Sequence, residues 1–206
     1  MKGILCFGDS ITFGRGEKPN FGWVGRLKRD FEKLSNWHVV YNLGIPGDTS
    51  SNLLNRFENE IKTRVKYLRE GDQFVIVVGI GTNDTPGDSP KNSNISIKKF
   101  KKHITKLITI SKKYSSNVLF LGLSPVDENL TLPWEGFYYT NGKQKKFEEV
   151  IKTCCLDKKA LFLPLFDTMI KKNYQELLKD GLHPNSKGYD FMFNIIKTFL
   201  EKNKLI

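Results

Sequence analysis

Ser10, Asp180 and His183 are the residues of this chain whose types could together support nucleophilic catalysis. A serine hydroxyl is a poor nucleophile until a base takes its proton, and an imidazole can do so near neutral pH. Asp180 precedes His183 by three residues in a stretch with loop character. Its carboxylate could accept a hydrogen bond from the imidazole Nδ1–H and leave Nε2 free for Ser10. These residue types predict acyl transfer through a covalent serine intermediate.

The chain has three histidines, and their contexts differ. His38 falls within a strand-like run, where a partly buried or edge position is expected. His103 lies among lysines on a predicted helix, where we expect a solvated and inert side chain. Only His183 has a carboxylate close by in a loop, and Pro184 is expected to fix the backbone after it and to open the last helix. His183 is therefore the candidate base.

Acyl transfer also requires hydrogen-bond donors for the oxyanion that forms when the serine attacks. Gly47 could supply a peptide N–H, because a glycine lets the backbone approach a substrate closely. Asn83 could supply its side-chain NH₂, and the N–H of Ser10 would complete three donors. For Asp9 and Asp48 we expect a structural role, in which each carboxylate binds nearby backbone N–H groups of its own turn.

Each of these motifs is weak when taken alone. Gly-Asp-Ser at residues 8–10 is a common turn sequence, and Asn83-Asp84 could simply cap a loop. Asp180-Gly181 is also typical of a helix end. The motifs are more specific as a set of four polar blocks, which occupy residues 8–12, 44–50, 81–84 and 180–185.

The elements that must position these blocks alternate along the chain. Short runs rich in Val, Ile, Leu and Phe predict strands, and their continuous apolar character is typical of a parallel sheet buried on both faces. The segments between them repeat apolar residues with helical spacing. We expect one three-layer α/β/α domain over residues 1–206, with a five-stranded parallel sheet. The predicted strands are residues 4–7, 38–43, 74–80, 118–123 and 161–166.

Three of the four blocks follow predicted strands directly, and the fourth can fold back to the same edge of the sheet. Ligands of open α/β sheets bind outside the carboxyl ends of the strands. The expected order of elements therefore predicts a single site that contains all four blocks.

Composition excludes several classes of protein. The 206 residues are 39% hydrophobic and include 15 Phe, which is enough to form a core and argues against disorder. No apolar run approaches the ~20 residues of a membrane span, so we expect a soluble protein. Cys6, Cys154 and Cys155 cannot form a disulfide framework, which favours a reducing cytoplasm, and the adjacent pair is expected to fill the core. Three scattered histidines and no paired carboxylate motif predict neither a metal nor a cofactor.

The formal net charge of +11 raises the question of a nucleic-acid partner. The densest basic stretch, residues 98–113, places apolar residues at helical spacing and leaves its lysines on the outer face. It carries no zinc-ligand pattern and no RNA-binding signature, so a solvated helix face is favoured over nucleic-acid binding. The charge could instead steer an anionic substrate to the site.

Two loops follow the third and fourth predicted strands, at residues 85–94 and 124–142. The second carries four aromatic residues, and such a loop after a parallel strand can line a substrate pocket. The same side chains could equally cap the hydrophobic core beneath a surface loop. Both interpretations stay open for Trp134, Phe137, Tyr138 and Tyr139.

At the four blocks the chain resembles the SGNH hydrolases, also called the GDSL lipase/esterase family. The matching residues are Ser10 in Gly-Asp-Ser, Gly47 in Gly-Asp-Thr-Ser, Asn83 in Gly-Thr-Asn-Asp and His183 in Asp-Gly-Leu-His-Pro. The resemblance implies that Ser10 is the nucleophile, His183 the base and Asp180 the third member of a triad. It also implies an oxyanion hole formed by the N–H groups of Ser10 and Gly47 and the amide of Asn83.

The same resemblance implies a flavodoxin-like fold with about five parallel strands in the order 2-1-3-4-5, which brings the ends of the first and third strands together. It favours a metal-independent esterase for a small ester. Thioesters, lysophospholipids and acetylated sugars are the alternative substrates, and a non-catalytic binding domain is the alternative from another class. The Gly-x-Ser-x-Gly elbow of the α/β-hydrolases is missing around Ser10. The sequence carries no signal for the oligomeric state.

Overall fold

The computed structural model describes residues 2–66 and 68–206. Its centre is a five-stranded parallel sheet in the order β2-β1-β3-β4-β5, as predicted. The strands lie close to their predicted positions, although β5 ends three residues earlier. They are β1 (Lys2–Gly8), β2 (Val39–Gly44), β3 (Gln73–Gly79), β4 (Asn117–Leu121) and β5 (Leu161–Leu163).

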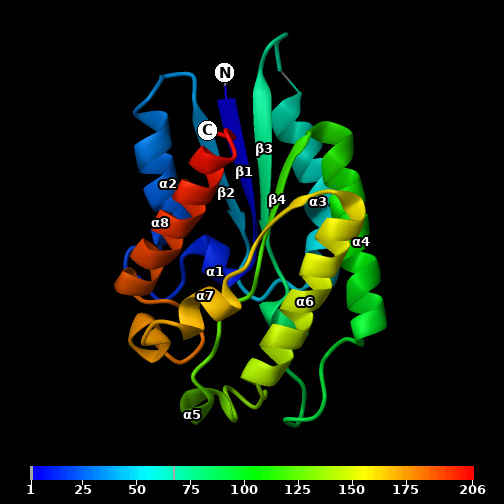
Figure 1. The fold of residues 1–206 in the computed structure, drawn as a ribbon, viewed down its shortest axis with the longest axis vertical. Helices are drawn as coiled ribbons and strands as arrows, with labels where there is room; N and C mark the ends of the chain where they lie inside the picture. The colour runs from blue at the N-terminus through cyan, green and yellow to red at the C-terminus, as the bar shows by residue number, and fades with distance from the viewer. Residues whose placement is uncertain (1, 67) are drawn as a thin grey trace.

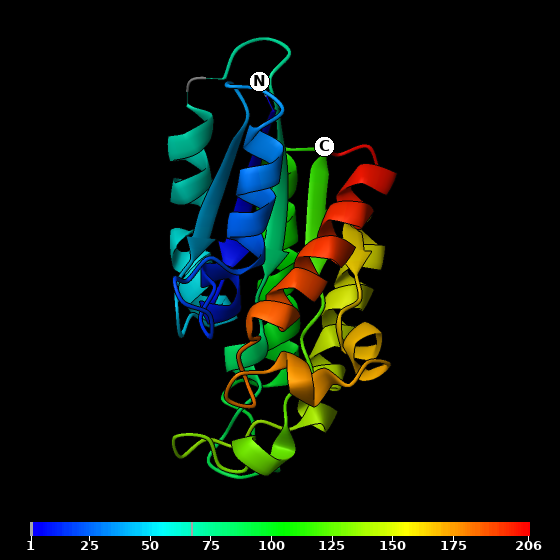
Figure 2. The same ribbon diagram turned by 90° about the vertical axis from the view of Figure 1, so that its left-hand side faces the viewer.

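Helices cover both faces of this sheet and complete the predicted three layers (Figure 1). On one face lie α2 (Gly22–Glu32) and α8 (Ser186–Lys202), which pack against each other in front of the strands in Figure 2. On the other face lie α3 (Ser50–Val65), α4 (Ile97–Tyr114) and α6 (Asn141–Lys158). The short elements are α1 (Ser10–Phe13), η1 (Thr82–Asp84), α5 (Glu128–Thr131), α7 (Phe166–Ile170) and η2 (Tyr174–Leu177).

Each central strand contributes side chains to two separate cores, which explains its continuous apolar sequence. In β1, Leu5 and Phe7 join the core beneath α3, α4 and α6, while Ile4 and Cys6 join the core beneath α2 and α8. Successive residues of a strand point to opposite faces, so a sheet covered on both sides requires apolar residues at every position. Cys154 and Cys155 are buried in the first core, as expected, and all three cysteines are unpaired.

The strand register brings the polar blocks to one level. Gly8, the last residue of β1, pairs with Gly44 at the end of β2 and with Gly79 at the end of β3. The residues that follow these three strands therefore start from the same edge of the sheet. Figure 1 shows this edge at the end opposite the two termini, together with α5 and α7.

The basic stretch forms α4, and its apolar positions Phe100, Ile104 and Leu107 are fully buried. Lys98, Lys99 and the other lysines of its first turns are exposed, as the helical spacing predicted. Across residues 2–66 and 68–206, no helix combines the length and the apolar character needed to cross a membrane.

Candidate active site

Ser10 is the first residue of α1, and the turn that holds it is fixed by Asp9. The carboxylate of Asp9 caps the helix by accepting the N–H of Ile11 (2.9 Å), which agrees with its expected structural role. Asp9 is 2% exposed, and burial raises its pKa to about 7. The hydroxyl of Ser10 therefore lies at a helix start anchored directly at the end of β1.

His183 lies within hydrogen-bond distance of both expected partners. Its Nε2 is 3.0 Å from Ser10 Oγ, and its Nδ1 is 2.8 Å from Asp180 Oδ2. Burial opposes ionisation of Asp180, but hydrogen bonds from the ring and backbone of His183 outweigh it and hold the Asp180 pKa at about 2. Asp180 is therefore a carboxylate at neutral pH. It favours the tautomer in which Nδ1 carries the proton and Nε2 can accept one from Ser10.

The loop that carries Asp180 and His183 is closed by its own backbone. The N–H of Lys179 donates to the His183 carbonyl (2.8 Å), and the N–H of Asn185 donates to the Leu177 carbonyl (2.9 Å). Asn185 then caps α8, which begins at Ser186, so Pro184 precedes the cap instead of opening the helix as expected. The cap requires a side-chain acceptor that proline does not have.

Asn83 and Gly47 lie beside Ser10 at the ends of the neighbouring strands. Asn83, in η1, donates one Nδ2–H to the carbonyl of Asp48 (3.0 Å), and its Oδ1 lies 3.4 Å from the hydroxyl of Tyr139. Gly47 adopts φ +84°, and a Cβ built on it would meet nothing within 4 Å. The left-handed backbone conformation therefore favours glycine here, and the space around it, where the sequence predicts close approach of a substrate, is free of protein atoms.

Asp48 does not bind its own turn, contrary to expectation. Its carboxylate pairs with Arg56 of α3, at 2.9 Å from Nε and 2.8 Å from Nη2. Nη2 of Arg56 also donates to the carbonyls of Gly8 (3.2 Å) and Leu43 (2.9 Å). Arg56 thus ties the ends of β1 and β2 to the turn that carries Gly47, a role that the sequence did not reveal.

A cavity of about 400 Å³ opens at these residues and is lined by Ser10, Gly47, Asn83 and His183 together. Three of the four aromatic candidates, Trp134, Phe137 and Tyr139, line it as well. Tyr138 does not; its N–H donates to Gly87 (3.1 Å) and its carbonyl accepts from Lys143 Nζ (2.6 Å).

The aromatic side chains that line the cavity also cover a small core. Tyr139 is buried with Val126 and Leu182 in a small cluster against which Trp134 packs. The Trp134 ring also meets the His183 ring edge-on, with the centroids 5.9 Å apart. The loop therefore covers a core and shapes the wall of the cavity with the same side chains.

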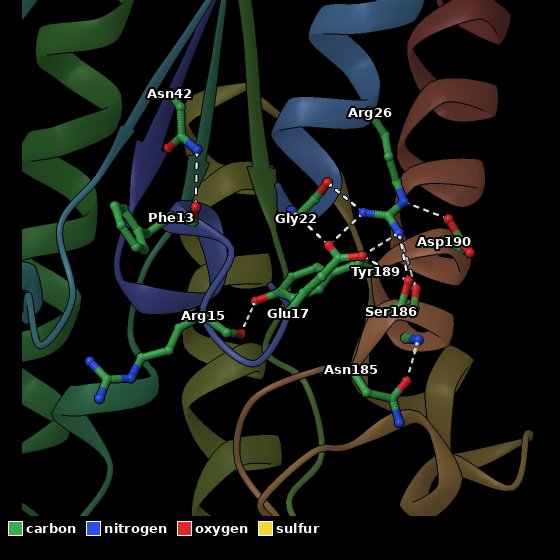
Figure 3. A network of polar contacts seen from close by, with 11 residues as sticks. Phe13, Arg15, Glu17, Gly22, Arg26, Asn42, Asn185, Ser186, Tyr189 and Asp190 are labelled. Carbon is green, nitrogen blue, oxygen red and sulfur yellow. Dashed lines mark hydrogen bonds and ion pairs between the residues drawn. The ribbon is translucent and has the colours of Figure 1, made fainter. Parts of the chain in front are cut away.

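A second network, also absent from the sequence predictions, fixes the segment after α1 (Figure 3). The Glu17 carboxylate binds the Arg26 guanidinium of α2 through both oxygens, at 2.7 and 2.8 Å, and accepts from Ser186 Oγ (2.7 Å). Arg26 also reaches Asp190 of α8 (2.5 Å), and Tyr189 donates to the carbonyl of Arg15 (2.6 Å). These bonds join the chain beyond Ser10 to α8, the helix that begins directly after the His183 loop.

His103 differs from the prediction. It is partly buried instead of solvated, and its Nδ1 lies 2.8 Å from the hydroxyl of Ser50 in α3. His38 precedes β2 and stacks on Phe31, with ring centroids 4.6 Å apart, which agrees with the expected partly buried position. Within residues 2–66 and 68–206, no group of three or more His, Cys, Asp and Glu side chains is arranged to hold a metal ion.

Comparison with known proteins gives one family match and many similar structures. The model of the GDSL-like lipase/acylhydrolase family matches residues 6–191. An isoamyl acetate-hydrolyzing esterase of Saccharomyces cerevisiae is 23% identical over 219 residues, covering 95% of this chain and 86% of the yeast protein.

Among solved structures, a lipase/acylhydrolase from Enterococcus faecalis superposes with a TM-score of 0.74 at 23% identity, covering 98% of this chain and 97% of its own. An acetyl xylan esterase gives a TM-score of 0.74 at 19% identity, with 96% and 99% covered. A psychrotrophic esterase from Pseudoalteromonas sp. gives 0.71 at 20% identity, with 99% of both chains covered. These structures share the fold of this chain over nearly its full length.

Proposed function

The chain belongs to the GDSL-like lipase/acylhydrolase family, and we propose that Ser10, His183 and Asp180 are its catalytic triad for ester hydrolysis. The observation that carries this proposal is the unbroken pair of contacts from Ser10 Oγ to His183 Nε2 (3.0 Å) and from His183 Nδ1 to Asp180 Oδ2 (2.8 Å). A nucleophile, a base and a group that orients the base are the parts required for covalent catalysis by serine.

In the first half of the reaction, Ser10 Oγ attacks the ester carbonyl carbon while its proton passes to His183 Nε2. The negative charge that forms on the carbonyl oxygen is stabilised by the N–H groups of Ser10 and Gly47 and by the second Nδ2–H of Asn83, since the first is held by Asp48. The bond from the carbonyl carbon to the alkoxy oxygen then breaks. His183 returns the proton to the departing alcohol, and the acyl group remains on Ser10.

In the second half, water attacks the acyl-serine with His183 again acting as the base. The bond between the acyl carbon and Ser10 Oγ breaks, Oγ recovers the proton from His183, and a carboxylic acid leaves. Throughout, Asp180 stabilises the imidazolium because its low pKa keeps it ionised.

We further propose that the substrate is an ester with a short acyl group. A cavity of about 400 Å³ lies at the small end of the range for ligand pockets, and Trp134, Phe137 and Tyr139 give its wall an apolar, aromatic character. The names of the yeast relative and of the acetyl xylan esterase both specify acetyl esters. Thioesters, lysophospholipids and acetylated sugars remain the alternative substrates for the same triad.

One observation favours an anionic substrate as a second candidate. Arg15 lines the cavity with an exposed side chain, and it forms no ion pair with any described residue. Glu135 lines the cavity as well and opposes the effect of Arg15. An anionic ester should therefore show a kcat/KM that falls with ionic strength and drops in Arg15→Gln. A kcat/KM independent of salt would contradict steering by charge.

The decisive experiment compares the protein with Ser10→Ala on p-nitrophenyl esters of increasing acyl length, acetylated sugars and acyl thioesters. We expect the protein to hydrolyse acetyl or propionyl esters fastest and to react with a fluorophosphonate probe, and Ser10→Ala to do neither. A folded Ser10→Ala variant that keeps full activity would overturn the mechanism. Labelling of neither protein would favour the binding-domain alternative.

The three unpaired, buried cysteines lead us to infer a cytoplasmic setting.

A further inference from the structure

A buried chain of polar contacts runs behind the candidate oxyanion hole and joins three elements. Asp84, in η1, accepts two hydrogen bonds from Ser50, the first residue of α3: one from the peptide N–H (2.8 Å) and one from the hydroxyl (2.6 Å). The same hydroxyl lies 2.8 Å from Nδ1 of His103 in α4. The chain Asp84–Ser50–His103, called the relay below, thus connects η1, α3 and α4.

Ser50 and Asp84 of the relay lie in the interior, and His103 at its other end is partly buried. Ser50 is 0% exposed and Asp84 is 1% exposed. Burial raises the pKa of Asp84 to about 6, and the two bonds from Ser50 limit that rise, so Asp84 is an anion at neutral pH. Burial, with the charges of Lys99 and Lys106, lowers the pKa of His103 and favours its neutral form.

These charge states define the direction of each bond. The anionic Asp84 accepts only, so the Ser50 hydroxyl donates to it and must accept from the neutral His103 through Nδ1–H. Asp84 therefore uses both oxygens on Ser50, and removing either partner would leave a buried polar group without its bond.

The relay lies next to two of the oxyanion donors of the proposed mechanism, Asn83 and Gly47. Asn83 immediately precedes Asp84, and Gly47 lies three residues before Ser50. The bond from Asn83 Nδ2 to the Asp48 carbonyl (3.0 Å) also crosses between the same two segments. Two of the three bonds between them thus end on Asp84.

We propose that Asp84 is a positioning residue for oxyanion stabilisation, held through Ser50 and His103, which sets the separation between Gly47 and Asn83. This inference rests on the proposed function of those two donors. The relay is not a second nucleophilic site, because Ser50 Oγ is fully buried and lies between the carboxylate and the imidazole instead of beyond the imidazole.

The first test is Asp84→Ala, assayed on the fastest p-nitrophenyl ester well below its melting temperature. Donors misplaced by less than an ångström lose most of their effect on the transition state, so we expect kcat to fall about 10- to 100-fold. KM should change less than about twofold, since the ground-state ester makes little use of these donors.

A boronic acid supplies a readout that a loss of stability alone would not move. Its adduct with Ser10 is tetrahedral and carries an oxygen toward the same donors, so its inhibition constant should weaken by about the same factor as kcat. Ser111→Ala is the matched control: it also removes a fully buried serine hydroxyl, but one bound only to the Leu107 carbonyl of its own helix (2.8 Å). We expect it to leave kcat and boronate affinity unchanged.

Conservative replacement tests the bond directions. In Asp84→Asn, the amide oxygen can accept the Ser50 N–H, and the amide NH₂ can donate to the Ser50 hydroxyl. The hydroxyl can then donate to His103 Nδ1 if the ring proton moves to Nε2. We expect kcat within about threefold of the parent protein. Asp84→Asn combined with His103→Leu removes that last acceptor, and its kcat should fall toward that of Asp84→Ala.

The outcomes separate this proposal from the proposed function. If the parent protein hydrolyses no ester and binds no boronate, the proposed function fails. If the parent is active and folded Asp84→Ala retains its kcat and boronate affinity, the positioning role is overturned. Should Asp84→Ala not fold, Ser50→Ala carries the same test. Unchanged kcat in that variant, or equal losses in Ser50→Ala and Ser111→Ala, would overturn it too.

Discussion

Asp180 binds both the main chain and the ring of His183. Oδ1 accepts the peptide N–H of His183 (2.8 Å), and Oδ2 lies 2.8 Å from its Nδ1. Oδ1 accepts the N–H of Leu182 as well (3.0 Å). One carboxylate therefore sets the fold of the loop with one oxygen and the orientation of the imidazole with the other. The two roles can be separated by mutation.

Asp180→Asn should preserve the loop and abolish most of the activity. The amide oxygen can keep both backbone bonds, but the amide NH₂ would then face Nδ1 and force the proton onto Nε2, which could no longer accept from Ser10. We expect kcat to fall by about 10³ to 10⁴ with little change in melting temperature. Asp180→Ala should lose the activity and the loop stability together. Activity of Asp180→Asn within tenfold of the parent would argue against the proposed triad.

Substitutions at Gly47 test whether a glycine is favoured there by its backbone conformation or by a lack of room for a side chain. Its φ of +84° is unfavourable for residues with a Cβ, while the surrounding space is open. Gly47→Val should lower the free energy of unfolding by about 1–2 kcal/mol and reduce kcat, whereas Gly47→Asn should lose less of both, since Asn tolerates this region. Urea unfolding and ester kinetics measure the two effects. Gly142→Ala, at another open position but in the first turn of α6, should cost nothing.

The raised pKa of Glu148 predicts that the free energy of unfolding falls as pH rises. It accepts the N–H groups of Leu123 and Phe166 (3.0 Å each), and burial raises its pKa from 4.5 to about 7. A pKa raised in the folded state means that the native protein binds the proton more tightly than the unfolded chain. The stabilisation is complete below pH 4.5 and is lost as pH rises through about 7.

Between pH 5 and pH 8 this group should lower the free energy of unfolding by about 2–3 kcal/mol. Glu148→Gln cannot release a proton, so its unfolding free energy should decline less over that interval by about this amount. Glu149→Gln removes the same charge from an exposed position of α6 and should keep the slope of the parent protein. Parallel pH profiles for the parent and Glu148→Gln would contradict the raised pKa.

The Glu17–Arg26 pair should behave as a coupled unit. Hydrogen bonds from Arg26 hold the pKa of Glu17 at about 2, and both side chains are largely buried (11% and 7% exposed). Glu17→Gln leaves a buried guanidinium without its main counter-charge and should cost about 3 kcal/mol of unfolding free energy.

Adding Arg26→Met to Glu17→Gln should restore part of that loss, because it removes the uncompensated charge. The measurement is a double-mutant cycle of urea unfolding. Asp167→Asn breaks the exposed pair with Lys145 (3.0 Å) and should cost less than about 1 kcal/mol. Additive losses in the Glu17–Arg26 cycle would show that the two side chains act independently.

The sequence patterns by themselves determined the layers and the edge at which the polar blocks meet, and the strand order followed from the family resemblance. Strands buried on both faces leave continuous apolar runs, as in β1 and β3, and amphipathic helices leave a 3.6-residue period, as in α4. Because parallel strands share a direction, blocks that follow β1, β2 and β3 had to reach one edge. The sequence could therefore place Ser10, Gly47 and Asn83 at one site.

The tertiary structure decided the contacts that the sequence motifs did not predict, and it set the distances of those that they did. Ser10 and His183 are separated by 173 residues, and the folded chain brings His183 Nε2 to 3.0 Å from Ser10 Oγ. Three further sets of contacts join segments that the sequence patterns do not connect. They involve Arg56, the Glu17–Arg26 pair and the relay through His103. Tyr138 and Tyr139 show most clearly what the sequence could not predict. They are adjacent tyrosines in one loop without helix or strand, so no repeating pattern predicts which of them faces the cavity, and only Tyr139 lines it.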